Sequence, residues 1–190
     1  MRYDHALSLE PHPDVYPPSE DSILLVESLE VSPGEKVLEI GCGSGVVAIH
    51  CALNGCRVTA ADMNPAALEN TTLNAAANGA HLEVFLSDVY DGVCGRYDTI
   101  VFNLPYLPVE EEGALALAWS GGPDGLGPLP DLLEGAPEHL LPGGRLVVVV
   151  SSLMDGPSLG GALSGFRVRV LGELPLFFES LRVLEIRLSS

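Results

Sequence analysis

Basic residues are scarce in this chain of 190 residues, which has 9 Lys and Arg against 26 Asp and Glu and a net charge of −17. Lys36 is the only lysine. A surface this acidic repels phosphate backbones at ordinary ionic strength, which argues against direct nucleic-acid binding. The same composition is typical of proteins adapted to molar salt, where the Debye length falls to about 3 Å. The charge therefore suggests a halophilic source and is only weak evidence on the substrate.

The chain also lacks long apolar runs and paired cysteines. Its longest strongly apolar run, 146–150, is far too short to span a bilayer, and residues 1–14 contain no apolar leader. The four cysteines form no CxxC pair and have no histidine at ligand spacing, so we expect reduced thiols, without a zinc site or a disulfide framework. We therefore expect a cytoplasmic location, no bound metal and one globular domain over residues 1–190.

Strand and helix patterns alternate along the chain. Buried strands are expected at 36–41, 57–62, 82–88, 98–103 and 145–150, and helices at 46–55, 65–79 and 129–140. The C-terminal residues alternate between apolar and polar on both sides of a loop, which predicts an antiparallel pair. The expected fold is an open, mainly parallel sheet with an antiparallel end, and its ligands should bind at the carboxyl ends of the strands.

A glycine cluster follows the first expected strand. Gly41, Gly43 and Gly45 have GxGxG spacing and come just after Glu39. Glycines let the backbone turn sharply and approach a ligand, and the helix that follows points its N-terminus at the same place. Val46 stands where the dinucleotide fingerprint needs its third glycine. The pattern favours S-adenosylmethionine over a nicotinamide or flavin dinucleotide, with a structural turn as the remaining interpretation.

Asp62 and Asp88 end the second and third expected strands. Asp62 is placed to accept hydrogen bonds from both ribose hydroxyls of a nucleotide. Its other interpretation is an N-cap for the helix that starts at Pro65. Asp88 is a candidate for binding the adenine amino group, and a helix cap or a loop role is the alternative.

The fourth expected strand stops on Asn103, and Leu104, Pro105 and Tyr106 follow at once. A tight turn alone would explain the asparagine. In a catalytic loop, the Asn103 side-chain oxygen and the Leu104 carbonyl would accept the two N–H bonds of an amide or amino group and aim its nitrogen at a methyl donor. Pro105 would stiffen this loop, and Tyr106 would cover the flat face of the acceptor.

Taken together, these motifs resemble class I S-adenosylmethionine-dependent methyltransferases, and specifically the HemK-type protein glutamine methyltransferases. The matching stretches are GxGxG at 41–45, DMNPAAL at 62–68, NLPY at 103–106, AWSGGPDGL at 118–126 and VYPPSEDS at 15–22. The last resembles the opening of the family's short archaeal and eukaryotic branch. The resemblance implies a Rossmann-like sheet of seven strands and methylation of the glutamine of a GGQ motif in a translation release factor. Leu104 departs from the family, which usually has proline there.

The resemblance also implies contacts to S-adenosylmethionine from an N-terminal segment, residues 1–30, that covers a core of residues 36–190. Ser19, Glu20 and the residues around them are also a good helix start, which is the plainer interpretation. The full expected set of cofactor-binding residues is Tyr16, Glu20, Ser22, Glu39, Gly41, Gly43, Gly45, Asp62, Met63, Asp88, Val89 and Asn103.

The short branch works with a small zinc-binding activator protein that adds a strand to an edge of the sheet. We therefore expect a heterodimer through the apolar strand from His81 to Leu86, unless the chain's own termini or loops cover that edge. Two other functions remain open. One is a nucleic-acid methyltransferase acting on adenine or cytosine amino groups, which shares the chemistry of the loop. The other is a non-catalytic subunit that binds the cofactor or a partner.

Overall fold

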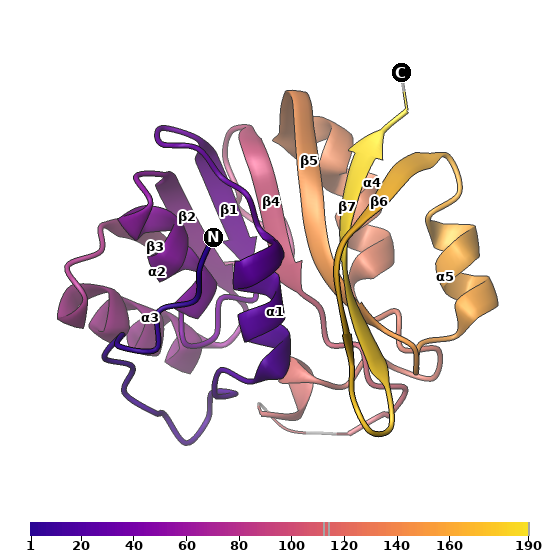
Figure 1. The fold of residues 1–190 in the computed structure, drawn as a ribbon, viewed down its shortest axis with the longest axis horizontal. Helices are drawn as coiled ribbons and strands as arrows, with labels where there is room; N and C mark the ends of the chain where they lie inside the picture. Colours follow the sequence, from indigo (N-terminus) through magenta and orange to yellow (C-terminus); the bar gives the residue numbers. More distant parts are fainter. Residues whose placement is uncertain (112, 114, 190) are drawn as a thin grey trace.

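The computed structural model describes residues 1–111, 113 and 115–189. Within them, seven strands form one sheet in the order β3-β2-β1-β4-β5-β7-β6 (Figure 1). The neighbouring strands from β3 to β5 pair in parallel, and β7 is antiparallel to both β5 and β6. The mainly parallel sheet with an antiparallel terminal pair confirms the predicted fold class. The strands are β1 (Lys36–Ile40), β2 (Arg57–Asp62), β3 (Leu82–Leu86), β4 (Tyr97–Asn103), β5 (Leu140–Ser151), β6 (Phe166–Pro175) and β7 (Ser180–Leu188).

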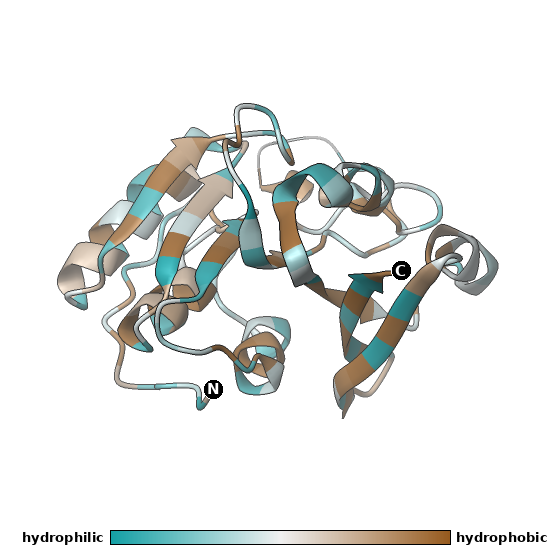
Figure 2. Cartoon of the chain, turned by 90° about the horizontal axis from the view of Figure 1, so that it is seen from above, coloured by the Kyte–Doolittle hydropathy of each residue, from teal (hydrophilic) through white to brown (hydrophobic). Residues whose placement is uncertain are grey.

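Helices cover both faces of the sheet, as the views in Figure 1 and Figure 2 show. Three of them pack on one face, where a buried cluster joins Leu25, Val47 and Val101. Two pack on the other face, in a cluster that includes Leu132 and Leu146. Because both faces are covered, the central strands are apolar on both sides, and their sequences are continuous hydrophobic runs. The helices are α1 (Glu20–Ser28), α2 (Val46–Leu53) and α3 (Pro65–Ala77) on the first face, α4 (Leu129–His139) and α5 (Gly156–Ala162) on the second, with a 3₁₀ turn η1 (Ala116–Ala118).

Helix α5 is absent from the sequence expectations, because its segment contains three glycines and has low helix propensity. It forms because the Asp155 side chain accepts a hydrogen bond from the Ser158 N–H at 2.8 Å, and because Leu159 packs on the cluster beneath α4. Strand β3 is shorter than expected and ends at Leu86, two residues before Asp88. None of the helices in the described residues is both long and apolar enough to cross a membrane.

Candidate active site

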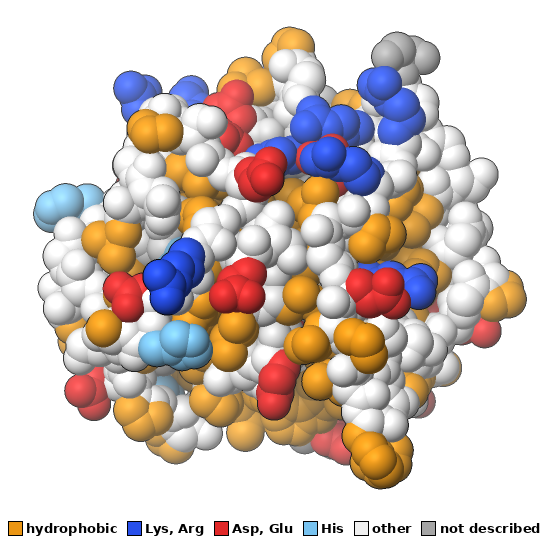
Figure 3. Space-filling model, viewed as in Figure 1, with side chains coloured by type: hydrophobic (Ala, Val, Ile, Leu, Met, Phe, Trp, Pro, Cys, Tyr) orange, Lys and Arg blue, Asp and Glu red, His pale blue; other side chains and the backbone are white. Residues whose placement is uncertain are grey.

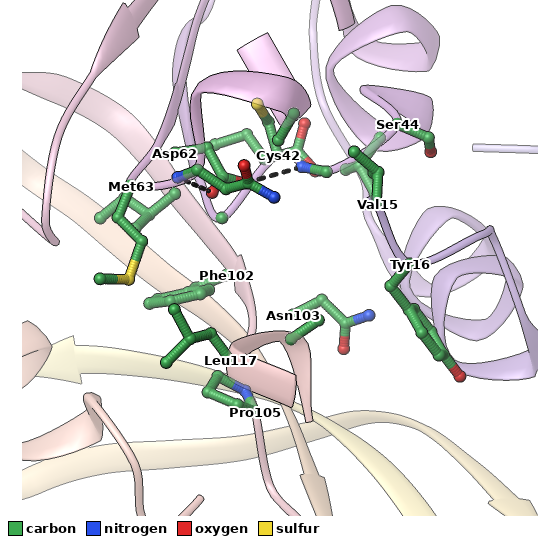
Figure 4. Close-up of a pocket in the computed structure, with 18 of the residues that line it drawn as sticks. Val15, Tyr16, Cys42, Ser44, Asp62, Met63, Phe102, Asn103, Pro105 and Leu117 are labelled. Carbon is green, nitrogen blue, oxygen red and sulfur yellow. Dashed lines mark hydrogen bonds between the residues drawn. The ribbon is translucent and has the colours of Figure 1, made fainter. Parts of the chain in front are cut away.

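A cavity of about 250 Å³ opens at the carboxyl ends of β1, β2 and β4 (Figure 4). The sequence predicts a ligand at this edge of the sheet, and most of the predicted residues lie there. Those that line the cavity are Tyr16, Ser22, Glu39, Gly41, Gly43, Asp62, Met63, Asp88, Val89, Asn103 and Pro105. Four predicted residues, Glu20, Gly45, Leu104 and Tyr106, are not part of its lining.

The glycine loop between β1 and α2 needs its glycines for packing as well as for ligand access. All three have positive φ, the left-handed region that other residues rarely adopt. A Cβ on Gly41 would lie 2.6 Å from the Phe102 ring, and one on Gly45 would lie 2.8 Å from the Thr71 side chain. A Cβ on Gly43 would meet nothing closer than 3.8 Å. Gly43 is therefore the position where the loop stays open to the cavity, and Gly45 supports the loop from beneath.

Asp62 holds the glycine loop in place. Its carboxylate accepts hydrogen bonds from the Gly43 N–H and the Asn64 N–H, both at 2.9 Å (Figure 4). The cap of α3 is Asn64, whose side chain accepts from the Ala66 N–H at 3.0 Å. The helix-cap interpretation of Asp62 is therefore wrong. A carboxylate has about four acceptor sites, so Asp62 keeps acceptor capacity for a ligand hydroxyl beside these backbone donors.

Glu39 is a buried carboxyl group on the cavity wall, and only 3% of the residue is exposed. Burial raises its pKa to about 8, and the nearby Asp62 charge acts in the same direction. The Ala48 N–H, which donates to the Glu39 carboxyl at 2.7 Å, opposes this shift. The site therefore contains a carboxyl group that is largely neutral at pH 7 unless a cation binds beside it.

This raised pKa predicts a pH-dependent stability. The folded-state pKa of Glu39 lies above its ordinary value of 4.5, so its stabilising effect is complete below pH 4.5 and is lost as the pH rises to about 8. In that window we expect the unfolding equilibrium constant to rise about tenfold per pH unit relative to a Glu39→Gln variant. Urea denaturation of both proteins across the window measures the difference. Parallel pH profiles would contradict it.

Asn103 is the last residue of β4, and its side chain points into the cavity (Figure 4). The Asn103 Oδ1 atom is buried and has no hydrogen-bond partner among the described residues. Leaving such an acceptor unpaired costs roughly 1–3 kcal/mol. A buried, unpaired acceptor in a cavity wall indicates that a donor from a ligand belongs there.

The rest of the predicted catalytic loop divides between the cavity and the core. Pro105 lines the cavity, but Leu104 is 1% exposed and belongs to the same buried cluster as Phe102 and Leu129. In place of the family's rigid proline, the chain has a side chain that anchors the loop by apolar burial.

The Tyr106 ring is partly buried and packs against both core clusters. Its hydroxyl donates to the Asp21 carboxylate at 3.3 Å. Asp21 also accepts from the Ser22 N–H at 2.5 Å and from the Ser22 hydroxyl at 3.1 Å. Burial, reinforced by the Asp21 charge, raises the pKa of Tyr106, so the phenol stays protonated. Tyr106 thereby connects the loop after β4 to the start of α1.

The glycine-rich segment 121–127 supports the loop after β4 from behind. A Cβ on Gly121 would lie 2.6 Å from the Pro105 carbonyl oxygen, and one on Gly125 would lie 2.7 Å from the Tyr106 carbonyl oxygen. The Gly121 N–H donates to the Leu107 carbonyl at 2.8 Å. Only glycine allows the two backbones to approach this closely, which gives the GGPDG motif a physical role.

The N-terminal segment reaches the cavity along α3. Asn70, Asn74 and Asn78 recur every four residues, so they share one helix face. These three residues, the asparagine ladder, bond the backbone of Ser8 and Glu10 at 2.8–2.9 Å, much as a neighbouring strand would.

Two links tie this segment to the site. The Asn74 amide donates to the Ser44 carbonyl of the glycine loop at 2.9 Å, and the Asn64 amide donates to the Asp14 carbonyl at 2.8 Å. Tyr16 and Ser22 follow and line the cavity. The neighbouring Glu20 is exposed and accepts a hydrogen bond from the Ser19 hydroxyl at 2.6 Å, because α1 begins at this point, as the plainer interpretation holds.

A family model for the methyltransferase small domain matches residues 18–168. The chain belongs to this family. The methyltransferase is 37% identical over 185 residues to a protein of Methanocaldococcus jannaschii that carries the provisional name protein N5-glutamine methyltransferase, covering 94% of both chains. It is 35% identical over 181 residues to the release factor glutamine methyltransferase of Cereibacter sphaeroides, covering 85% of this chain and 63% of that protein. These relatives confirm the predicted resemblance.

Two further comparisons bear on the alternatives. The methyltransferase is 34% identical over 158 residues to the ribosomal RNA small subunit methyltransferase C of Chromohalobacter salexigens, covering 80% of this chain and 44% of that protein. A solved chain from the Mtq2–Trm112 complex of E. cuniculi, described as responsible for methylation of the termination factor eRF1, superposes with a TM-score of 0.74 at 21% identity. The superposition covers 93% of this chain and 99% of that chain. At this identity the likeness supports the fold.

Several residues that line the cavity of the methyltransferase are absent from the sequence predictions: Val15, Cys42, Ser44, Asn64, Phe102, Leu117 and Ser120. Val15, Cys42 and Phe102 look like ordinary core residues, and they come to the cavity because they adjoin predicted site residues. Leu117 directly precedes the AWSGGPDGL stretch and Ser120 lies within it. Both reach the cavity because this segment folds back against the loop after β4, where the Leu107 N–H donates to the Trp119 carbonyl at 2.9 Å. The Asn64-Pro65 pair also carried a local signal, since asparagine before proline favours a helix start.

Proposed function

We propose that this methyltransferase transfers the methyl group of S-adenosylmethionine to the side-chain amide nitrogen of the glutamine in the GGQ motif of a translation release factor. The observation that carries the proposal is the buried Asn103 Oδ1 in the cavity wall, which has no partner among the described residues. It is supported by two relatives whose names give them as glutamine methyltransferases. An amide N–H is the donor that this acceptor fits.

S-adenosylmethionine fits the residues of the cavity. Asp62 offers acceptors for the ribose hydroxyls, and Gly43 leaves the backbone open to a ligand. The N-terminus of α2 suits the carboxylate of the methionine part, and Glu39 suits a nearby cation. When bound, the cofactor supplies a methyl group on a positively charged sulfur. The expected set of cofactor-binding residues is part of this proposal, as is the role of residues 1–30 as the cover of a single-domain enzyme.

The chain's contribution to transfer is alignment. The Asn103 oxygen accepts one N–H of the glutamine amide. The second is assigned to the backbone carbonyl of Leu104, although this residue is buried behind the cavity lining and its side chain packs in the core. These two contacts turn the nitrogen lone pair toward the methyl carbon, where an N–C bond forms as the C–S bond breaks with its electron pair left on sulfur. The amide nitrogen then sheds one proton to water, so a separate general base is not required. Tyr106, held by Asp21, fixes the loop that presents these acceptors.

The direct test is mass spectrometry of a purified release factor after incubation with the enzyme and labelled S-adenosylmethionine. A single added methyl group on the GGQ glutamine supports the proposal, and a release factor in which that glutamine is alanine should stay unlabelled. Labelling of ribosomal RNA instead would favour the second candidate, which the ribosomal RNA relative suggests. The net charge of −17 argues against that candidate at ordinary salt.

A partner belongs to the same proposal. Strand β3 lies at the edge of the sheet and pairs only with β2 in the described part of the chain. Leu86, at its end, is 57% exposed. We infer that a small zinc-binding activator protein adds a strand to this edge and that any zinc belongs to the partner; no zinc-binding cluster occurs among the residues described here. The named Mtq2–Trm112 complex supports this view.

Coexpression with such an activator tests this edge. We expect the wild-type chain to copurify with it and to gain solubility. Leu86→Lys, a change at an exposed residue of β3, should lose both effects, because a lysine buried by the added strand has no partner. Val168→Lys, a matched change on β6 at the opposite edge, should keep them. A wild-type chain that is soluble, monomeric and fully active alone would show that no partner is required.

The cellular setting completes the proposal. A release factor acts on ribosomes, so we place the enzyme in the cytoplasm. The excess of acidic residues supports a halophilic source. The test is the free energy of unfolding in molar potassium chloride, which should exceed the value at low salt.

A further inference from the structure

The tip of the β6–β7 hairpin exposes two aromatic side chains. Phe177 is 92% exposed and Phe178 is 86% exposed, and their rings meet edge to face with centroids 4.7 Å apart. In Figure 3 this tip is an apolar protrusion at the bottom of the molecule. Each phenylalanine can bury about 150–250 Å² in a partner, and a pair exposed to water normally marks a contact site.

The hairpin does not need these aromatic residues for its own turn. The Leu176 N–H donates to the Glu179 carbonyl at 2.7 Å, so Phe177 and Phe178 are the two central residues of a tight connection. Glycine, asparagine and aspartate are the usual residues there. Neither phenylalanine packs in either main core cluster. The fold therefore leaves their presence unexplained.

The tip projects from the same end of the sheet as the cavity, and β7 lies two strands away from β4, which carries Asn103. In the sheet register Asn103 pairs with Val149, which pairs in turn with Val183. Phe178 lies five residues before Val183, so at about 3.3 Å per residue the tip projects roughly 17 Å beyond the level of Asn103. Directly after the tip, the Glu179 carboxylate accepts from the hydroxyl of Ser151, the last residue of β5, at 2.5 Å, which ties the hairpin to the sheet. Figure 1 shows the hairpin reaching past the carboxyl ends of the strands.

Charge is divided between the two ends of the molecule. Of the 9 basic residues, all but Arg2 and Arg182 lie toward the amino ends of the parallel strands, and Figure 3 shows basic side chains gathered along the upper rim. Arg182, nearer the cavity, is paired with Glu173 at 3.0 Å. At the cavity end, Asp14, Glu39, Asp62 and Asp88 line the cavity. Further acidic residues of this end are Glu20 at the start of α1, Glu110, Glu111 and Asp124 in the segment after β4, Asp155 after β5 and Glu179 in the β6–β7 turn. A partner that approaches the cavity therefore meets a negative surface around an apolar tip.

We propose that Phe177 and Phe178 anchor the protein that carries the acceptor glutamine, and that this protein presents an apolar pocket within a basic surface. The inference rests on the proposed function, since it requires a protein substrate. A second copy of this chain fits poorly, because two acidic cavity ends repel each other. The acidic rim also disfavours a nucleic acid or an anionic membrane at the tip. The hairpin adds contact area far from the reacting atoms, where binding energy positions the substrate.

The test compares a folded substrate with a short peptide. The double variant Phe177→Ser/Phe178→Ser should lower kcat/KM for an intact release factor at least about tenfold, since buried aromatic anchors carry much of an interface's affinity. With a short synthetic peptide containing Gly-Gly-Gln, which cannot span the distance to the tip, kcat/KM should be unchanged. The matched control Val168→Ser/Val170→Ser removes apolar side chains that are 42% and 52% exposed on β6, and it should leave both activities unchanged.

Salt gives an independent readout. Raising the ionic strength from about 0.1 M to about 1 M shortens the Debye length from 10 Å to 3 Å, so kcat/KM for the intact basic substrate should fall in the wild type. Equal kcat/KM of wild type and double variant on the intact protein would overturn the docking role. A second result would also overturn the docking role: sedimentation that shows a dimer for the wild type and a monomer for the double variant. The tip would then be a site of self-association. Failure of the wild type to methylate either substrate would reject the proposed function instead.

Discussion

Replacing Asn103 with alanine is expected to lower kcat by roughly 10²-fold or more, the usual cost of losing a preorganised catalytic hydrogen bond. The affinity for S-adenosylmethionine should change much less, because the lost acceptor faces the substrate amide. The variant should be at least as stable as the wild type, because it removes a buried acceptor that has no partner among the described residues. Steady-state kinetics, calorimetric cofactor binding and thermal unfolding measure the three effects.

Asn54→Ala is the matched control for this prediction. The Asn54 side chain donates to the His50 carbonyl at 2.8 Å at the end of α2 and does not line the cavity. Its replacement should cost some stability and leave kcat intact, which is the reverse of the Asn103 pattern. Normal turnover in Asn103→Ala would remove the acceptor role and leave the asparagine as a turn residue.

The second large effect is expected from Gly121→Val, at a residue outside the cavity lining. Its new Cβ would lie 2.6 Å from the Pro105 carbonyl oxygen and 2.8 Å from the Gly125 carbonyl oxygen, both of them backbone atoms that cannot rotate away. The loop after β4 must then shift, and a displacement of about 1 Å at reacting groups can cost 10²-fold in rate. We expect kcat to fall by a similar factor while cofactor affinity changes little.

Gly160→Ala provides the comparison for this second change. Gly160 lies in α5, where an added Cβ meets no atom within 4 Å, and alanine there should stabilise the helix by up to about 1 kcal/mol. Its activity should equal that of the wild type. If Gly121→Val kept full activity in a folded protein, the glycine-rich segment would have no role in supporting the loop.

The sheet and the inner part of the site are predictable from the sequence, because each depends on short local patterns. Strands β1, β2 and β4 are parallel neighbours, so their carboxyl ends lie at one edge of the sheet. The glycine loop, Asp62 and Asn103 come at these ends and therefore meet there. Glu20 follows the local helix-start signal at Ser19. The positions of Leu104 and Tyr106 are not predictable from local patterns, because both depend on how their loop packs against elements that are remote in sequence.

Two further findings could not be predicted from local sequence: that α5 forms a helix, and why the GGPDG segment needs glycines. In both, tertiary packing outweighs local propensity. Helix α5 forms from a segment with three glycines, since a cap and an apolar contact outweigh propensity. The GGPDG segment looks like a flexible loop, and only its approach to the Pro105 carbonyl reveals the need for glycine. Sequence periodicity indicates which face of a helix or strand is buried. It does not indicate which loops contact one another.

The asparagine ladder gives the enzyme a way to open without disturbing its sheet. Its rungs are side-chain amides, so residues 8–10 can separate from α3 one hydrogen bond at a time while every strand stays paired. Segments held by a few exposed hydrogen bonds unfold locally at a free energy well below that of the whole protein. Backbone amides of Ser8 and Glu10 should therefore exchange with deuterium long before those of β1. If S-adenosylmethionine binds as proposed, we expect spent cofactor to leave through this local opening, at the cost of the four hydrogen bonds of the ladder.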